Sequence, residues 1–272
     1  MRRRQRSSSA ARARPTAITG GSSGIGLALA RRYAREGSRL LLIARREAQL
    51  HEAARELAGL GAEVRAAAAD VTDRERLREA VARAAAGWPP PARLICAAGQ
   101  LAAGRAQPLD AAAARRLFEV NLLGTAATVD TFLPMMLPHG GTIALVASMV
   151  ARHPFTGLAA YAISKWALDG YHRALASQLR GTGVRVLVAY PSIVDTPMVH
   201  RLLAEEAVPP AVYRAWPARD PQRVAERLAR AIDAGRPRIF VSAADRAADL
   251  LLRAAPILGA ALLDRLTAIR AR

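Results

Sequence analysis

Two side chains four residues apart, Tyr161 and Lys165, could together move a proton. A free tyrosine has a pKa of about 10, which is poorly matched to proton exchange at neutral pH. A nearby cation favours the phenolate and lowers this pKa. We expect a helix over residues 159–179, and side chains at positions i and i+4 share one face of a helix. By itself the pair is more typical of an exposed helix face, and it predicts proton transfer only together with Ser148, Asn121 and the glycine turn.

The composition makes Lys165 informative. It is the only lysine among 40 basic residues, and Asn121 is the only asparagine in 272 residues. Such Arg-rich and Ala-rich usage is typical of GC-rich coding. An ammonium is a compact, titratable point charge, and guanidinium does not replace it. The retention of lysine at this one position therefore indicates that an amine is needed there.

A glycine-rich turn supplies a second motif. Thr19-Gly20-Gly21-Ser22-Ser23-Gly24-Ile25-Gly26 lies between an apolar strand pattern and an amphipathic helix pattern. Glycines at such a turn let the backbone approach a pyrophosphate, and the helix N-terminus offers free N–H groups. An ordinary tight turn also uses glycine, but the strand–glycine–helix context favours dinucleotide binding.

Strand and helix patterns alternate along the chain. We expect strands at 16–19, 39–44, 63–67, 93–96, 141–147, 184–189 and 238–241. We expect helices at 25–35, 46–59, 74–86, 111–136, 159–179, 221–234 and 244–267. This alternation predicts an α/β protein with a doubly wound parallel sheet of about seven strands and helices on both faces. Ser148 would then end a strand at the carboxyl edge of the sheet, where ligands bind.

These motifs resemble the short-chain dehydrogenase/reductase family, over residues 16 to about 240. The glycine turn reads TGxxxGxG, residues 161–165 read YxxxK, and residues 191–196 resemble PGxxxT. The resemblance implies a single-domain Rossmann fold and four catalytic residues, Asn121, Ser148, Tyr161 and Lys165. Tyr161 would exchange the proton, Ser148 would bind the substrate oxygen, and Asn121 would help to place a water linked to Lys165. The implied cofactor-binding residues are Gly20, Ser22, Ser23, Gly24, Ile25, Gly26, Arg45, Arg46, Asp70, Val71, Ala98, Gly99, Tyr161, Lys165, Pro191, Ile193 and Thr196.

Two positions depart from the family pattern. Residues 96–99 read Cys-Ala-Ala-Gly where the family usually has Asn-Asn-Ala-Gly. Ser192 stands where the family usually has glycine. We expect the first change to remove polar contacts between strands and the second to alter the nicotinamide loop slightly.

The second strand pattern ends in Ala44-Arg45-Arg46. A carboxylate at this point would bind a ribose 2′-hydroxyl and select NAD, and Ala44 supplies none. Arg45 can instead pair with a 2′-phosphate through a charge-assisted contact. We therefore expect NADP(H) rather than NAD, because the missing acid does not depend on the abundance of arginine.

The formal charge of +18 raises the question of nucleic acid as a partner. The arginines are spread along the chain and interleaved with acids, so we do not expect nucleic-acid binding. Cys96 is the only cysteine, which excludes an intrachain disulfide and a cysteine-based metal site. We expect no metal, a reducing cytoplasmic location, and, from the resemblance, a homodimer or homotetramer.

Three segments flank or interrupt the expected Rossmann domain, residues 15–243. Residues 1–14 hold six arginines and no apolar core, which predicts a basic disordered tail rather than a secretory signal. Residues 192–220 are irregular and proline-rich, which predicts a lid. Residues 244–272 form an apolar helical segment that we expect to pack on the domain or on a partner subunit, with a substrate channel or peripheral membrane contact as the alternatives.

The substrate is less defined by the sequence. His153, Pro154 and Phe155 lie between Ser148 and Tyr161, and with the lid they suit a moderately apolar or lipid-like carbonyl compound or alcohol. Residues 188–197 resemble reductases of long-chain keto lipids, such as 3-ketodihydrosphingosine reductase. A 3-oxoacyl or secondary-metabolite ketoreductase is equally compatible. An NADP-binding sensor or scaffold without turnover is the non-enzymatic alternative.

Overall fold

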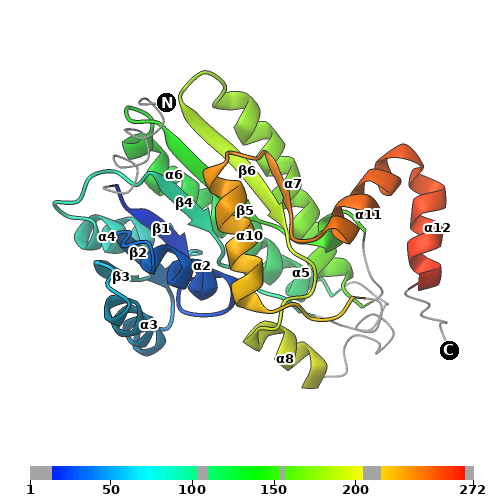
Figure 1. Cartoon of the computed structure of the whole chain (residues 1–272), viewed down its shortest axis with the longest axis horizontal. Helices are drawn as coiled ribbons and strands as arrows, with labels where there is room; N and C mark the ends of the chain where they lie inside the picture. The colour runs from blue at the N-terminus through cyan, green and yellow to red at the C-terminus, as the bar shows by residue number, and fades with distance from the viewer. Residues whose placement is uncertain (1–13, 103–109, 154–156, 205–215, 267–272) are drawn as a thin grey trace.

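A seven-stranded parallel sheet forms the centre of the protein, in the order β3-β2-β1-β4-β5-β6-β7. The computed structural model describes residues 14–102, 110–153, 157–204 and 216–266 (Figure 1). The strands are β1 (Thr16–Thr19), β2 (Leu40–Ala44), β3 (Val64–Ala68), β4 (Arg93–Cys96), β5 (Gly141–Val146), β6 (Val184–Tyr190) and β7 (Arg238–Phe240). The strand order reverses between the neighbours β1 and β4. The helices that follow these two strands lie on opposite faces of the sheet. Ligands of open α/β sheets bind at such a reversal. The expected doubly wound Rossmann sheet is confirmed.

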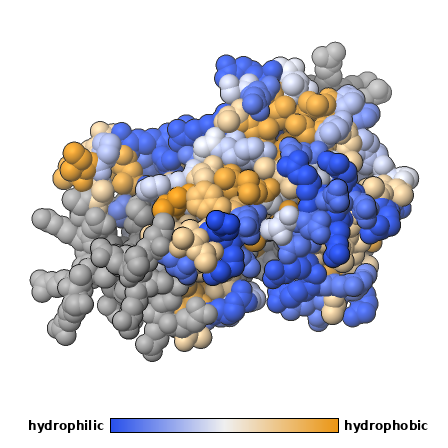
Figure 2. Space-filling view, turned by 180° about the vertical axis from the view of Figure 1, so that it is seen from behind, coloured by the Kyte–Doolittle hydropathy of each residue, from blue (hydrophilic) through white to orange (hydrophobic). Residues whose placement is uncertain are grey.

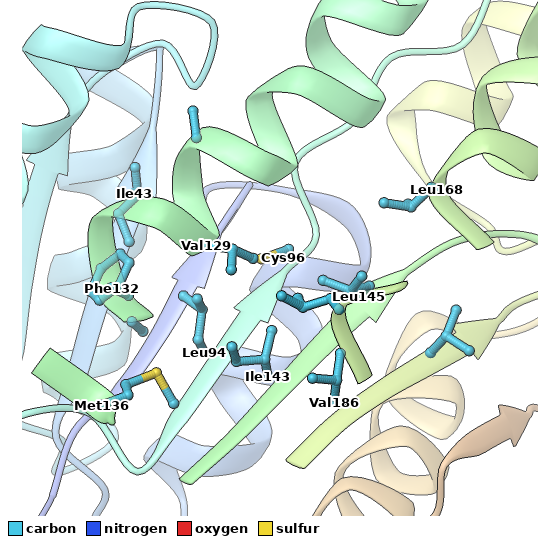
Figure 3. Close-up of a cluster of buried hydrophobic side chains, with 14 of the residues drawn as sticks. Ile43, Leu94, Cys96, Val129, Phe132, Met136, Ile143, Leu145, Leu168 and Val186 are labelled. Atoms are coloured by element: carbon cyan, nitrogen blue, oxygen red, sulfur yellow. The ribbon is translucent and has the colours of Figure 1, made fainter. Parts of the chain in front are cut away.

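Helices cover both faces of this sheet. They are α2 (Gly24–Ala34), α3 (Glu47–Gly59), α4 (Arg74–Ala84), α5 (Ala111–Phe118), α6 (Gly124–Met136), α7 (Ala159–Gln178), α8 (Pro197–Ala204), α10 (Pro221–Asp233), α11 (Ala243–Ala254) and α12 (Pro256–Leu266). One core cluster joins strand residues to α4, α6 and α7 (Figure 3). The other joins them to α2, α3 and α10.

The strand β2 shows how the sequence produces these two layers. Leu41 and Ile43 belong to the cluster under α4 and α6, whereas Leu40 and Leu42 belong to the cluster under α2 and α3. Successive strand side chains point to opposite faces, so a strand covered on both sides needs a continuous apolar run. The tetrapeptide Leu-Leu-Leu-Ile provides this run. Packing on both faces holds β2 in the sheet and so positions its carboxyl end, where the site lies.

The prediction of one long helix over residues 111–136 is wrong in one respect. A π-helical turn, Glu119–Leu123, separates α5 from α6. Asn121 lies in this turn and is fully buried. A π turn is an insertion that re-aims side chains, and such turns are frequent at functional sites. The apolar periodicity of the sequence does not predict this π-helical turn.

The C-terminal helix expected at 244–267 is in fact two helices. α11 ends at Ala254, and α12 begins at Pro256, because a proline cannot continue a helix through its missing N–H group. The segment expected to be irregular, 192–220, contains the short helix α8, and Val194 pairs with Arg219 in an isolated parallel bridge. Residues 205–215 of that segment and the expected tail, 1–13, lie outside the described residues.

Within the described ranges, no helix combines the length and apolarity required to cross a bilayer.

Candidate active site

The glycine turn folds back on the sheet at the end of β1. Gly20 and Gly24 have φ angles of +68° and +54°, a region that favours glycine. A Cβ atom on Gly20 would lie 2.9 Å from the backbone of Ala97 and Ala98, directly after β4. A Cβ atom on Gly26 would lie 2.3 Å from the carbonyl oxygen of Gly20. The first turn of α2 therefore packs directly on the turn that precedes it.

This packing gives a first prediction. We expect Gly26→Ala to weaken binding of a dinucleotide at least tenfold, because the added methyl must displace the Gly20 backbone. We expect Gly170→Ala, in the middle of α7 with nothing within 4 Å of the added Cβ, to be neutral or to stabilise the fold by about 0.5–1 kcal/mol. Calorimetric titration with NADPH and thermal unfolding of both variants check this. Unchanged affinity in Gly26→Ala would contradict the role given to the turn.

A cavity of about 560 Å³ opens at the carboxyl ends of the strands. It runs from the glycine turn to the end of β5. Of the residues proposed from sequence, those that line it are Gly20, Ser22, Ser23, Gly24, Ile25, Gly26, Arg45, Arg46, Asp70, Val71, Ala98, Gly99, Ser148, Tyr161, Lys165, Pro191, Ile193 and Thr196. The structure thus brings together residues that are as far apart in sequence as Gly20 and Thr196, and Asn121 alone of the proposed set is not among the lining residues.

Ser148, Tyr161 and Lys165 meet at one end of this cavity. Ser148 follows β5, and its hydroxyl forms a hydrogen bond with the Tyr161 phenol. Lys165 is buried, and its Nζ atom donates to the carbonyl oxygen of Val146 at 3.0 Å. The Nζ atom lies 5.8 Å from the centre of the Tyr161 ring. The buried stripe of α7, which also carries Leu168 and Leu175 into the core, aims both side chains inward.

Burial dominates the titration of this pair. Burial raises the pKa of Tyr161 to about 12, against the opposing effect of the hydrogen bond with Ser148. Burial lowers the pKa of Lys165 to about 8. This differs from the expectation that the cation lowers the phenol pKa below its usual value, because removal from water disfavours the phenolate more strongly. At neutral pH the arrangement holds a protonated phenol beside a protonated amine, which suits a proton donor.

Asn121 acts one layer behind the cavity. Its Oδ1 atom accepts from the backbone N–H of Gln100 at 2.8 Å, and its Nδ2 group donates to Gln100 O at 3.0 Å and to Ser164 Oγ at 2.9 Å. Ser164 Oγ in turn donates to the carbonyl oxygen of Tyr161 at 2.7 Å. The amide therefore ties the segment after β4 to the first turn of α7. The water-placing role that the resemblance implied stays a prediction.

The far end of the cavity carries charge. Asp70 follows β3, and its carboxylate accepts from the Thr72 backbone N–H at 3.0 Å and from the Thr72 hydroxyl at 2.8 Å. Arg45 Nη1 lies 3.4 Å from Asp70 Oδ2, and the Arg45 side chain is 63% exposed. Arg45 is thus available at the mouth, beside the end of β2.

The two departures from the family pattern have structural consequences. Thr19 Oγ1 accepts from the backbone N–H of Ala98 at 3.2 Å, so a link between β1 and the segment after β4 persists without the usual asparagines. Ser192 Oγ donates to Asp245 Oδ2 at 3.3 Å and accepts from Arg219 Nε at 3.1 Å. Ser192 therefore connects the loop after β6 to the C-terminal helix α11.

Sequence reasoning missed several positions at or near this cavity, among them Ser164, Arg152 and Ala248. Ser164, inside the YxxxK segment, links Asn121 to α7. Arg152 pairs with buried acids on two helices but is hidden among many arginines. Ala248, in α11, lines the cavity although it lies about a hundred residues after Ser148. The spacing of YxxxK could have indicated Ser164, whereas the other two depend on tertiary packing.

A glycine turn, a buried Tyr–Lys pair and a serine at the carboxyl edge of a Rossmann sheet define a nicotinamide-dependent oxidoreductase. Residues 15–207 match the family described as short chain dehydrogenase. The chain belongs to this family, as its motifs predicted, and it is an oxidoreductase.

Relatives and solved structures agree with this assignment. The 1-deoxy-11-beta-hydroxypentalenate dehydrogenase of Streptomyces exfoliatus is 39% identical over 196 residues, which cover 70% of this chain and 71% of the relative. A short chain dehydrogenase/reductase from Burkholderia phymatum in complex with NAD superposes with a TM-score of 0.79 at 26% identity, covering 90% of this chain and 94% of that one. An actinorhodin polyketide ketoreductase variant with NADPH gives 0.77 at 28% identity, covering 84% and 95%.

The residues present fit a nicotinamide dinucleotide. A Cβ atom at position 20 or 26 would collide with backbone atoms, so glycine at both positions lets the turn pack closely against its neighbours. Gly99 leaves space beside the Lys165 amine, because a Cβ atom there would lie 3.5 Å from Nζ and 3.2 Å from Asn121 Oδ1. Backbone N–H groups and a helix N-terminus suit the pyrophosphate, and the amine suits a ribose hydroxyl.

Proposed function

We propose that this protein is an NADP(H)-dependent ketoreductase or alcohol dehydrogenase that acts on a moderately apolar carbonyl compound or secondary alcohol. The observation that carries the proposal is the convergence of Ser148, Tyr161 and Lys165 on one cavity whose other end is the glycine turn. Ala147, Met149, Val150 and Leu158 also line the cavity, and their side chains are apolar. A substrate hydroxyl group that faced these side chains would be left unpaired.

The residues divide the chemistry between them. The bound nicotinamide supplies or accepts the hydride. Ser148 and Tyr161 hold the carbonyl oxygen with their hydroxyl groups. Tyr161 gives its proton to that oxygen during reduction and takes it back during oxidation. Lys165 stabilises the charge that develops on the phenol oxygen as the proton leaves.

The direct test is consumption of NADPH against a panel of keto lipids, 3-oxoacyl thioesters, steroids and small ketones. We expect turnover with apolar ketones. A 3-oxoacyl or secondary-metabolite ketoreductase would show a strong preference for thioesters or cyclic ketones in this panel. Binding of NADPH with no turnover of any member would favour the sensor or scaffold reading, which the intact Tyr161–Lys165 pair argues against.

The choice of NADP(H) rests on the residues at the end of β2. Ala44 offers no carboxylate to a ribose 2′-hydroxyl, and the exposed Arg45 is free to leave its 3.4 Å contact with Asp70 for a 2′-phosphate. We expect kcat/KM with NADPH to exceed that with NADH at least tenfold. Arg45→Ala should reduce this ratio by about 10- to 150-fold, mainly through KM, because one charge-assisted contact contributes about 1.5–3 kcal/mol. A preference for NADH in the unmodified protein would overturn the assignment.

The pKa of Lys165 predicts a pH dependence. The amine carries its proton below pH 8 and loses it above, whereas the phenol of Tyr161 stays protonated up to about pH 12. We therefore expect kcat for carbonyl reduction to be level between pH 6 and 7 and to fall as the pH rises through about 8, because the charge that stabilises the forming phenolate is lost. A profile that rises through pH 8 in the direction of reduction would contradict this.

The remaining features of the proposal follow the family. The substrate is a small molecule, and we place the protein in the cytoplasm as a homodimer or homotetramer without a nucleic-acid partner. Sedimentation at two ionic strengths tests the oligomer, and retention on immobilised DNA tests the last point.

A further inference from the structure

A second hollow, of about 400 Å³, lies beside the catalytic cavity. Its lining residues are Ala151, Arg152, His153, Trp166, Asp169, Leu252, Pro256 and Ala260. We call it the α11 groove, because α11 and the start of α12 form one wall and α7 forms the other. His153 lines both hollows. The groove and the catalytic cavity are therefore neighbours, with the buried His153 side chain between them.

One face of α11 passes from the cavity to the groove. Ala248 lines the catalytic cavity and Leu252 lines the groove. Residues four apart lie on the same side of a helix, so these two side chains form one apolar track. On the opposite wall, the large side chain of Trp166 is 45% exposed. Aromatic residues make up only 4% of this chain.

Buried ion pairs hold α11 in this position. Arg152 Nε donates to Asp249 Oδ1 at 2.6 Å, and Asp249 is 2% exposed. Arg152 Nη1 also lies 3.4 Å from Asp169 Oδ2 on α7, and Asp169 accepts a hydrogen bond from Tyr190. Removing one partner of such a pair is strongly unfavourable, so the pairs fix the relative position of the two walls.

The charged lining residues Arg152 and Asp169 pair with each other, and five of the other six lining residues are apolar, His153 being the exception. The exposed apolar residues Ile257 and Leu258 of α12 are not among the lining residues. Both residues lie on α12, and Figure 2 shows apolar surface at the end of the molecule that carries this helix. An occupant of the groove would thus contact α7 and α11 rather than this outer surface.

We infer that the α11 groove binds the apolar tail of the substrate while its carbonyl group lies at Ser148 and Tyr161. The substrate class is then a ketone with an unbranched hydrocarbon chain long enough to pass His153. This inference rests on the proposed function. The border that the groove shares with the catalytic cavity at His153, and the α11 face that lines both, favour a tail of the same molecule over a separate partner.

A chain-length series tests the inference. With linear methyl ketones from 2-butanone to 2-decanone, kcat/KM should rise by about fourfold for each methylene that becomes buried. Leu252→Ala should flatten this rise for the longer members and leave 2-butanone unchanged. Leu250→Ala is the matched control, because Leu250 lies on the same helix, is 54% exposed and lines neither hollow. Equal effects of the two substitutions, or no dependence on chain length, would overturn the inference.

Tryptophan fluorescence supplies a readout that does not need turnover. Filling the groove with 2-decanone should remove water from Trp166 and shift its emission to shorter wavelength. The shift should be much smaller in Trp166→Phe, where Trp88 and Trp216 remain and only Trp216 lines the catalytic cavity. An undiminished shift in Trp166→Phe would place the tail outside the groove and overturn the inference. If no ketone consumes NADPH but this shift is present, the proposed function fails, whereas binding of an apolar chain in the groove is supported.

Discussion

Tyr161→Phe is expected to lose most turnover and to keep its affinity for NADPH. The substitution removes one hydroxyl group from a buried side chain and leaves the ring in place. That hydroxyl is the only phenol in the part of the cavity the structure describes, and it forms a hydrogen bond with Ser148. A positioned general acid contributes about 10²–10⁴-fold to a rate, so kcat should fall by that factor. Steady-state kinetics and calorimetric titration with NADPH separate the two effects.

Tyr171→Phe is the matched control for this variant. Tyr171 lies on the same helix, α7, and does not line the catalytic cavity. We expect its kcat to stay within about twofold of the unmodified value, since ordinary substitutions outside a site change free energies by about 0.5 kcal/mol or less. A fully active Tyr161→Phe, or equal losses in both variants, would refute proton transfer by Tyr161.

Lys165→Arg is expected to be the second most damaging change, although it keeps a positive charge. The lysine is 4% exposed, and its Nζ atom lies 3.0 Å from the Val146 carbonyl oxygen. Gly99 lies against the same amine, so the planar guanidinium has to displace neighbours or withdraw. A displacement of about 1 Å at a catalytic group can cost about 10²-fold, and we expect a loss of kcat of at least this size.

The measurement is kcat for Lys165→Arg alongside its thermal unfolding. A folded variant that binds NADPH and has lost turnover would support a need for the amine itself. Lys165→Met extends the test, because it keeps an unbranched chain without charge and should also lose turnover. Near-normal kcat in Lys165→Arg would show that any cation at this position is sufficient.

Much of this site is readable from the sequence because its chemistry uses short local patterns. The glycine turn needs glycine wherever a Cβ atom would meet backbone, as at Gly26. The Tyr161–Lys165 spacing follows from one turn of helix. The doubly wound parallel sheet also follows from simple patterns, since strands that alternate with helices favour this arrangement. These features do not depend on which distant residues are brought together.

Other features depend on tertiary contacts and were not readable. The π turn at Asn121 changes the direction of a side chain without altering the apolar periodicity around it. The placement of Ala248 at the cavity requires α11 to lie beside Ser148, and this is fixed by the pairing of Arg152 with Asp249. In a chain with so many arginines, no single arginine indicates a buried ion pair. The reversal of the expected pKa shift of Tyr161 likewise reflects burial, which only the packed structure reveals.

The most direct test of the central claim is a crystal structure of the protein with NADPH. We predict that the pyrophosphate contacts the turn from Gly20 to Gly26, and that the nicotinamide ring lies beside Tyr161 and Ser148 with the Lys165 amine at the adjoining ribose. A dinucleotide bound with its nicotinamide away from Tyr161, or a Tyr161 hydroxyl turned out of the cavity in that complex, would contradict the account.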